Sequence, residues 1–198
     1  MKTIKTTIAI LAISIFTLSC SKDDAPASIQ PVVLAPLQDP LPEYLAVTGF
    51  DQKVTEIIDE PSNAERGFSF IPLINGKITA IVVKMPSVNN TGMRVTIWDK
   101  IANVVLRTET INITTPSTVT TKTITALDLL KNKEYFITFN SNDRYKREKT
   151  NGSNATYPFA VGDILITGFS YQNGSSQSMP MVPASNYLSG DCSFKFQK

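Results

Sequence analysis

Short apolar segments separated by turn residues recur along most of the chain, and this pattern constrains the fold more than any other feature. The clearest segment is 93–98, where Met93, Val95 and Ile97 share one face because side chains alternate along a strand. Asn75-Gly76, which lies between two other segments, is typical of a tight hairpin turn. Sustained helical periodicity is missing from every window. The sequence therefore predicts an all-β protein.

About eight to ten strands at a spacing of roughly ten residues are typical of an antiparallel two-sheet sandwich. Residues 44–50 are also expected to be extended, and 127–132 to form a short turn. Long polar loops are expected at 140–156 and 172–178. The predicted strands are 53–58, 66–71, 77–85, 93–98, 103–112, 118–125, 134–139, 164–171 and 192–196.

Residues 1–19 have the composition of a cleaved secretion signal. Lys2 and Lys5 give the segment a positive start, and the apolar run 8–16 follows them. This run is shorter than the roughly 20 apolar residues that a transmembrane helix needs. A signal peptide that is removed from the mature protein is therefore expected.

Residues 17–20 resemble a lipobox, the motif at the end of a bacterial lipoprotein signal. Ser19 matches the small residue before the cysteine, whereas Leu18 lies one position nearer the cysteine than is usual. The resemblance implies that Cys20 is diacylated and becomes the mature N-terminus, anchored to a membrane by lipid. The alternative is an ordinary cleaved signal with an incidental cysteine.

Ser21-Lys22-Asp23-Asp24 resembles the acidic export signal of Bacteroidota-type surface lipoproteins. The resemblance implies delivery to the outer face of the outer membrane, with a periplasm-facing anchor or a plain solvated linker as alternatives. Residues 20–42 are predicted to be the lipidated N-terminus and an extended tether, and 43–198 the sandwich domain. The tether follows from five closely spaced prolines: Pro26, Pro31, Pro36, Pro40 and Pro42.

Charge and composition exclude several functional classes. The formal net charge of +2 falls to zero without the leader and its two lysines, and a neutral domain argues against nucleic acid as a partner. The chain has no histidine, which removes Ser-His-Asp and Cys-His triads and His-ligated zinc. With Cys20 lipidated, Cys192 has no disulfide partner, and its alternation with two phenylalanines predicts a buried thiol. We expect no cofactor.

Four segments in order also resemble a known kind of domain. They are 65–70 (a G-F-x-F strand), 76–78, 95–99 (a V-x-I-W strand) and 129–135, which ends in tyrosine. This order is similar to that of β-sandwich domains of unknown function in bacterial surface proteins. Those domains resemble carbohydrate-binding jelly rolls, so the resemblance implies a jelly-roll-like sandwich, and it implies fold more than function.

Trp98, the single tryptophan, is the first candidate for ligand binding. Alternation places it with Arg94 and Thr96 on the face opposite Val95 and Ile97. An exposed indole beside polar groups would stack on a sugar ring. The alternative is that both faces of this strand are covered and Trp98 belongs to the core.

The expected loop 140–156 supplies the second set of candidates: Arg144, Tyr145 and Arg147. Long loops are where sandwiches place binding residues, and a basic loop with aromatic residues suits an acidic glycan or a partner protein. The alternative is a solvated loop without a ligand.

Acidic residues give no convincing catalytic or metal motif. Asn140, Asn142 and Asp143 could offer oxygens to calcium, but their spacing is not that of an EF-hand, so no metal site is predicted. A glycan-active hydrolase would need two paired carboxylates. Nothing in the sequence pairs any of the acids near strand ends, which are Asp99, Glu134, Asp143, Asp163 and Asp191.

The features together favour a lipid-anchored cell-envelope protein that displays a non-catalytic binding sandwich, with a glycan as the favoured ligand. The alternative is a structural, adhesive or assembly subunit of an envelope complex, whose partner is another envelope protein. A small glycan-active hydrolase ranks third. The lipid and the outer membrane place the mature N-terminus at the cell envelope in each case.

Overall fold

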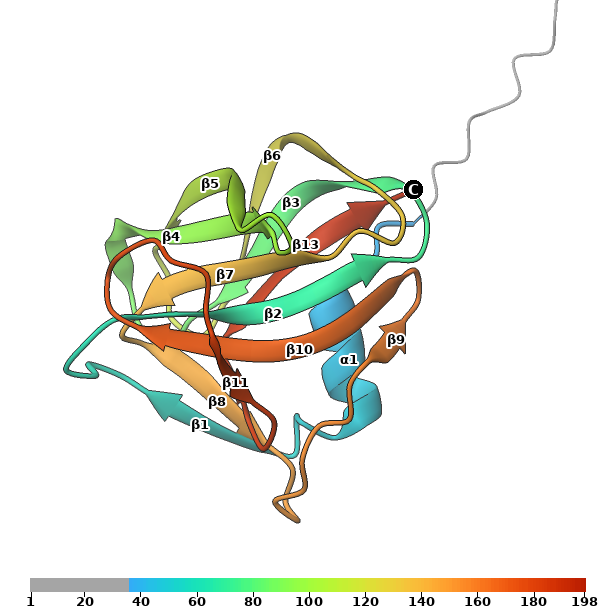
Figure 1. The fold of residues 1–198 in the computed structure, drawn as a ribbon. Helices are drawn as coiled ribbons and strands as arrows, with labels where there is room; N and C mark the ends of the chain where they lie inside the picture. Colours follow the sequence, from blue (N-terminus) through green and yellow to red (C-terminus); the bar gives the residue numbers. More distant parts are fainter. Residues whose placement is uncertain (1–35) are drawn as a thin grey trace, which may run out of the picture. The chain divides into compact units, whose positions relative to one another are not determined.

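Two antiparallel sheets packed face to face contain most of the strand residues in the computed structural model, which describes residues 36–198 (Figure 1). The predicted signal peptide, Cys20 and most of the expected tether lie outside the described residues. Between residues 36 and 198, no helix is long and apolar enough to cross a membrane. The predicted all-β antiparallel sandwich is confirmed.

The larger sheet has β10 near one edge and β5 at the other, with the short β9 also paired to β10. Its strands, in spatial order, are β11 (Val182–Ala184), β10 (Ile164–Asn173), β2 (Ala64–Pro72), β7 (Tyr135–Ser141), β4 (Asn89–Asp99) and β5 (Val104–Ile113), and β9 is Phe159–Val161. The smaller sheet consists of β13 (Asp191–Gln197), β3 (Gly76–Lys84) and β6 (Val119–Leu129). A third sheet contains β1 (Lys53–Ile57), β8 (Arg144–Glu148) and β12 (Leu188–Ser189).

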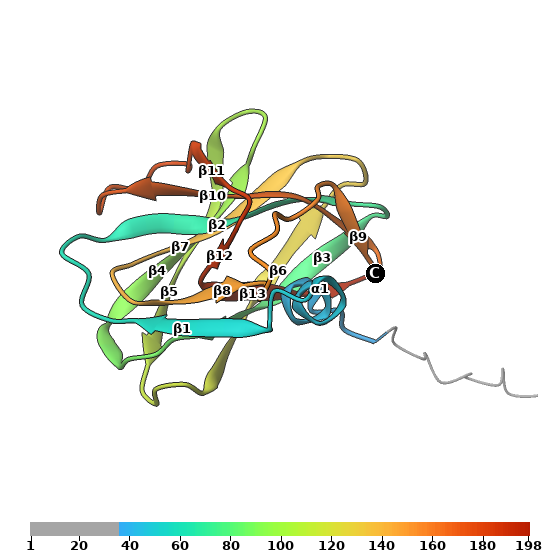
Figure 2. The same cartoon turned by 90° about the horizontal axis from the view of Figure 1, so that it is seen from below.

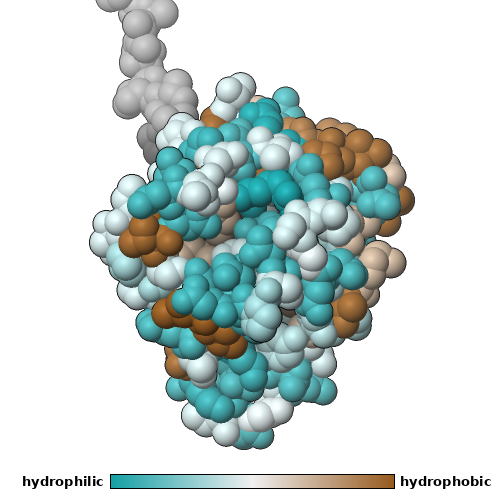
Figure 3. All heavy atoms as spheres, turned by 90° about the vertical axis from the view of Figure 1, so that its left-hand side faces the viewer, coloured by the Kyte–Doolittle hydropathy of each residue, from teal (hydrophilic) through white to brown (hydrophobic). Residues whose placement is uncertain are grey.

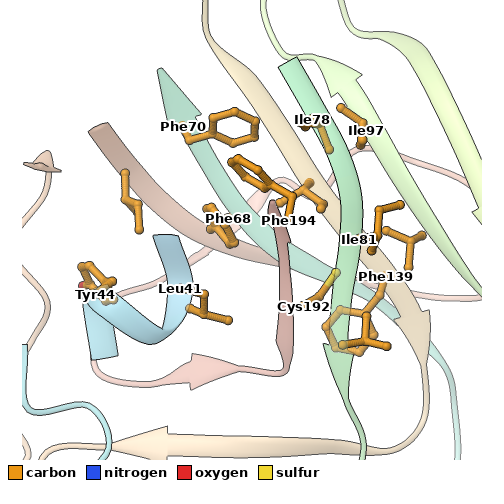
Figure 4. Packing of buried hydrophobic residues seen from close by; sticks show 14 of the residues in the cluster. Leu41, Tyr44, Phe68, Phe70, Ile78, Ile81, Ile97, Phe139, Cys192 and Phe194 are labelled. Atoms are coloured by element: carbon orange, nitrogen blue, oxygen red, sulfur yellow. The ribbon is translucent and has the colours of Figure 1, made fainter. Parts of the chain in front are cut away.

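The core lies between the larger sheet and the β13-β3-β6 sheet. Figure 4 shows Phe68 and Phe70 of β2 beside Phe194 of β13, and the rings of Phe70 and Phe194 have centroids 4.5 Å apart. All three phenylalanines have no exposed surface. Complete burial of such a side chain stabilises the fold by about 1.5–3 kcal/mol. Cys192 of β13 is also buried, as its alternation predicted.

The segment 44–50 is not extended; α1 (Pro40–Thr48) occupies most of it and packs beside β13 (Figure 2). Pro40 is the first residue of the helix, a position where the N–H that proline lacks would have no partner in the helix. Gly49 ends the helix with a left-handed φ of 77° and donates its N–H to Leu45 O at 3.1 Å. The expectation of a strand is wrong here because these two ends suit a helix, whose Tyr44 is fully enclosed by the core.

The end of the expected tether is part of the domain. Gln38 forms a backbone bridge with Phe196 of β13, with N···O distances of 2.9 and 2.8 Å. Leu41, in the first turn of α1, is only 3% exposed. The compact unit therefore includes residues 36–42, which precede the expected start of the domain at residue 43.

Long-range pairing also changes two expected turns or loops. The loop expected at 140–156 is mostly strand in its first half, because β7 extends to Ser141 and β8 pairs with both β1 and β12. The turn expected at 127–132 begins as strand, since residues 127–129 of β6 pair with the start of β3. Neither pairing leaves a local pattern, because each partner lies far away in the sequence.

Candidate binding pocket on the outer face of the large sheet

The outer face of the larger sheet carries the polar side chains of β4. Arg94 lies opposite Asn140 of β7, which in turn lies opposite Glu65 of β2. Directly opposed residues in an antiparallel pair point to the same face. The predicted facing of Arg94, Thr96 and Trp98 away from the core is therefore confirmed by the strand register.

The indole ring of Trp98 is not accessible for stacking on a sugar. Only 4% of the residue is exposed, and its Nε1 donates a hydrogen bond to Thr138 Oγ1 at 3.0 Å. Stacking on a sugar needs an accessible ring face, so the expectation of an exposed indole is wrong. The alternative, that both faces of the strand are covered, describes the molecule.

A fully buried carboxylate organises this face. Glu65 has no exposed surface, and its Oε1 accepts a hydrogen bond from Thr138 Oγ1 at 2.5 Å. Its Oε2 accepts from Arg94 Nη2 at 2.8 Å. A buried charge is tolerated only when it is paired and hydrogen-bonded, so Glu65 holds the Arg94 guanidinium in one position.

The loop between β10 and β11 covers part of the same face. Asn140 Nδ2 donates to the Gly174 carbonyl at 2.9 Å, and Arg94 Nη2 donates to the Ser175 carbonyl at 3.0 Å. Gln177 Nε2 donates to the hydroxyls of Thr96 at 3.0 Å and of Thr108 at 2.7 Å. The polar loop expected at 172–178 is therefore tied to the sheet by side-chain hydrogen bonds.

A polar pocket of about 410 Å³ opens where β2 and β4 begin and β7 ends. These strand ends lie at the left of Figure 1, and Figure 3, which views that side, shows mostly hydrophilic side chains in its middle. The pocket is lined by Asn63, Asn89, Thr91, Gly92, Arg94, Asn140, Ser141, Asn142 and Ser175. Four amide side chains and three hydroxyls thus surround one guanidinium.

The pocket is electrically neutral although it contains a cation. Arg94 is the one charged residue of the lining, and Glu65 beneath it cancels its charge. Among the described residues no hydrogen-bond partner is found for the buried Nε of Arg94. Burial leaves this donor unpaired within the described domain.

The structure does not bring Arg144, Tyr145 and Arg147 to this pocket, because all three lie on β8. Arg147 forms a bidentate pair with Asp191, with both N···O distances at 2.6 Å. Tyr145 is 3% exposed and donates its hydroxyl to Ser117 Oγ at 2.7 Å. The charges expected to attract an acidic glycan are thus largely used within the domain.

Arg144 belongs to a cluster with Glu60 and Arg66. Glu60 Oε2 contacts both arginines, at 2.7 Å from Arg66 Nη2. Burial alone would raise the pKa of Glu60, but the two guanidinium groups outweigh it and hold the pKa below its ordinary value. Burial and the neighbouring Arg144 lower the pKa of Arg66 to about 10.

Two of the candidate acids share another hollow, of about 570 Å³, that is lined in part by Asp99 and Glu134. Each is paired with a lysine: Asp99 with Lys133 at 2.6 Å and Glu134 with Lys100 at 2.8 Å. The hydrogen bond from Lys133 lowers the pKa of Asp99. A general acid in a glycosidase needs the opposite shift, so Asp99 does not suit that role.

The remaining acids are also engaged inside the domain. Asp143 accepts the Asp59 N–H at 2.6 Å and the Ser87 hydroxyl, which occupies both of its carboxylate oxygens. Asp163 pairs with Lys198 at 3.3 Å. Within residues 36–198, no three His, Cys, Asp or Glu side chains are grouped so that they could hold a metal ion.

The sequence predicts that Arg94 faces away from the core, but it does not predict that the other lining residues meet beside Arg94. Asn63 precedes β2, Asn89 opens β4 and Asn142 follows β7, so their proximity depends on the order of strands in the sheet. Asparagines at the ends of neighbouring strands were the only available hint, and they are equally typical of turns. No protein-family model, curated protein or solved structure matches this chain.

Proposed function

We propose that the domain is a non-catalytic binding module whose polar pocket takes a glycan. The observation that carries this proposal is the wall of the pocket, in which four asparagines surround Arg94. Each sugar hydroxyl both donates and accepts a hydrogen bond, and an amide side chain offers both a donor and an acceptor. The volume of about 410 Å³ lies within the usual range for small-ligand pockets.

The neutrality of the pocket favours an uncharged glycan over an acidic one. Glu65 compensates Arg94, and the basic side chains of β8 are paired elsewhere with Glu60, Glu148 and Asp191. Because Trp98 is covered, binding in this pocket relies on hydrogen bonds and not on aromatic stacking. Such sites depend on several amides acting together, so removal of one amide is expected to weaken binding measurably.

The lipid anchor completes the proposal. The resemblance of residues 17–20 to a lipobox, and of 21–24 to an acidic export signal, supports a diacylated Cys20 in the outer membrane with the domain facing outwards. A periplasm-facing anchor is the alternative. Metabolic labelling with a fatty-acid analogue, with and without Cys20→Ala, tests the anchor, and protease access on intact cells tests the orientation.

A glycan array tests the pocket. We expect binding to a neutral glycan by the unmodified chain, weakened by Asn63→Ala and by Arg94→Lys, which keeps the charge beside Glu65 but removes the planar guanidinium. Asn154→Ala is the matched control, because Asn154 is exposed and does not line the pocket. The proposal is wrong if a broad array shows no binding, or if the two pocket variants bind as the control does.

A structural or assembly role is the second candidate function. One observation favours it: consecutive apolar residues are exposed on β5, an edge strand of the larger sheet. Chemical crosslinking in cells that recovered neither a partner protein nor a second copy would count against this role.

A further inference from the structure

The two edges of the sandwich differ in how well they are covered. On one side α1, β9 and β11 lie against the ends of the sheets, whereas on the other side β5 and β6 are edge strands (Figure 1). Within residues 36–198, β5 pairs only with β4. An exposed edge strand presents unpaired N–H and C=O groups to which another strand can bind.

The first half of β5 is apolar and exposed. Val104 is 52% exposed, Val105 40% and Leu106 37%, and Ile101 in the preceding turn is 78% exposed. Natural edge strands are usually protected by lysines, prolines or covering loops. This half of β5 has no lysine or proline among its own residues, so it is a candidate surface for strand addition.

The second half of β5 is protected by a single lysine from β6. Lys122 Nζ donates to the Thr110 carbonyl at 2.9 Å and pairs with Glu109 at 2.8 Å. The Thr110 carbonyl therefore points away from β4. Backbone groups of alternate residues in a strand point the same way, so the N–H and C=O of Thr108 also face the open edge.

We propose that β5 pairs antiparallel with β5 of a second copy of this chain, with the two-fold axis at Thr108. The segment Arg107-Thr108-Glu109 is complementary to itself in this register, because each arginine lies opposite the glutamate of the other copy. A two-fold axis at Arg107 or at Glu109 would instead place like charges opposite each other. Charge complementarity thus selects both the occupant and the register.

The same register affects the hydrogen bond that Lys122 donates to β5. Leu106 of the second copy lies opposite Thr110, so the incoming strand displaces Lys122 from the Thr110 carbonyl. A single pair of strands buries a small area, so we expect a weak, concentration-dependent dimer.

Cysteine crosslinking tests the register in the full chain. Thr108 would face its own copy in a hydrogen-bonded pair with Cα atoms about 5.5 Å apart, which suits a disulfide. Thr108→Cys is therefore expected to form a disulfide-linked dimer under mild oxidation. Thr110→Cys is the matched control, because at about 3.4 Å per residue its two copies lie roughly 14 Å apart and should not crosslink.

Sedimentation of the full chain tests the surface without a cysteine. We expect the dimer fraction to rise with concentration and to disappear in Leu106→Lys, whereas Val47→Lys, which alters an exposed valine on α1, leaves it unchanged. A monomer at every concentration overturns the proposal.

The other outcomes of the crosslinking experiment show whether the edge of β5 binds a second copy, another part of the same chain or a different protein. Efficient crosslinking of the Thr110→Cys variant overturns the register. If the chain is monomeric and the new thiol of the Thr108→Cys variant is shielded from a thiol reagent, another part of the same chain covers the edge. Capture of a different protein by the Thr108→Cys variant, without the homodimer, overturns the proposal and assigns the edge to that partner.

Discussion

Both faces of β4 are largely buried but are held by different chemistry. Met93, Val95 and Ile97 on the inner face are at most 1% exposed and pack in the apolar core. On the outer face, Thr96 and Trp98 are 0% and 4% exposed, yet hydrogen bonds to other strands and to the covering loop hold them in place. Burial alone therefore does not distinguish a core from a polar layer, and only the outer layer opens into a pocket.

Removal of apolar volume from the inner face should have the largest effect on the free energy of unfolding. We expect Ile97→Ala to lower the free energy of unfolding by about 2–5 kcal/mol, because it leaves a cavity between the sheets. Urea denaturation followed by circular dichroism measures the change. Val104→Ala, which truncates a valine that is 52% exposed on the neighbouring strand, is the control. A loss below about 1 kcal/mol for Ile97→Ala would contradict a tightly packed inner face.

Glu65→Gln tests whether the outer layer depends on its buried charge. The substitution keeps the shape but leaves Arg94 without its carboxylate, so we expect a loss of about 1.5–3 kcal/mol. The double variant Glu65→Gln/Arg94→Leu removes the stranded charge as well and should recover part of that loss. If the single variant were as stable as the unmodified chain, the Glu65–Arg94 pair would have no organising role.

Trp98→Phe should have a smaller effect on the free energy of unfolding. The change removes the hydrogen bond from Nε1 to Thr138 and retains an aromatic ring, so a loss of about 0.5–1.5 kcal/mol is expected. Glycan binding should persist, because Trp98 does not line the pocket. The same residue allows a direct check of burial: as the single tryptophan, it should emit at short wavelength in the folded protein and shift to the red on unfolding.

Acidification should have the smallest effect on stability, through the charged cluster of Glu60, Arg66 and Arg144 near the start of β2. Arg66 lies opposite Phe139 of β7 and pairs with Glu60. Because its arginine partners lower the pKa of Glu60 in the folded state, its stabilising contribution is present above the ordinary value of 4.5 and is lost as the pH falls below it.

The measurement for this last prediction is the stability of Glu60→Gln relative to the unmodified chain between about pH 7 and pH 3. The difference between the two proteins should shrink as the pH falls, since the carboxylate becomes protonated in both the folded and the unfolded chain. A difference that stays constant over this range would show that ionisation of Glu60 contributes nothing.

Much of the strand content was predictable from local pattern. Strands β1, β2, β3, β5, β7, β10 and β13 lie close to the expected ranges, because period-two alternation and β-branched residues are local properties of the sequence. The short β9, β11 and β12 were not predicted, since two to three residues are too few to show a period. The helix α1 was not predicted because its short apolar run is also compatible with a strand.

The sequence by itself determined which side chains of a strand share a face, as the placement of Arg94 and Trp98 opposite Val95 and Ile97 shows. The tertiary structure alone decided what covers each face: a second sheet on one side, and a tied loop with a polar pocket on the other. The physical reason is that side-chain direction follows from the backbone of one strand, whereas burial depends on distant segments, such as Ser175, which lies 81 residues beyond Arg94 and covers it.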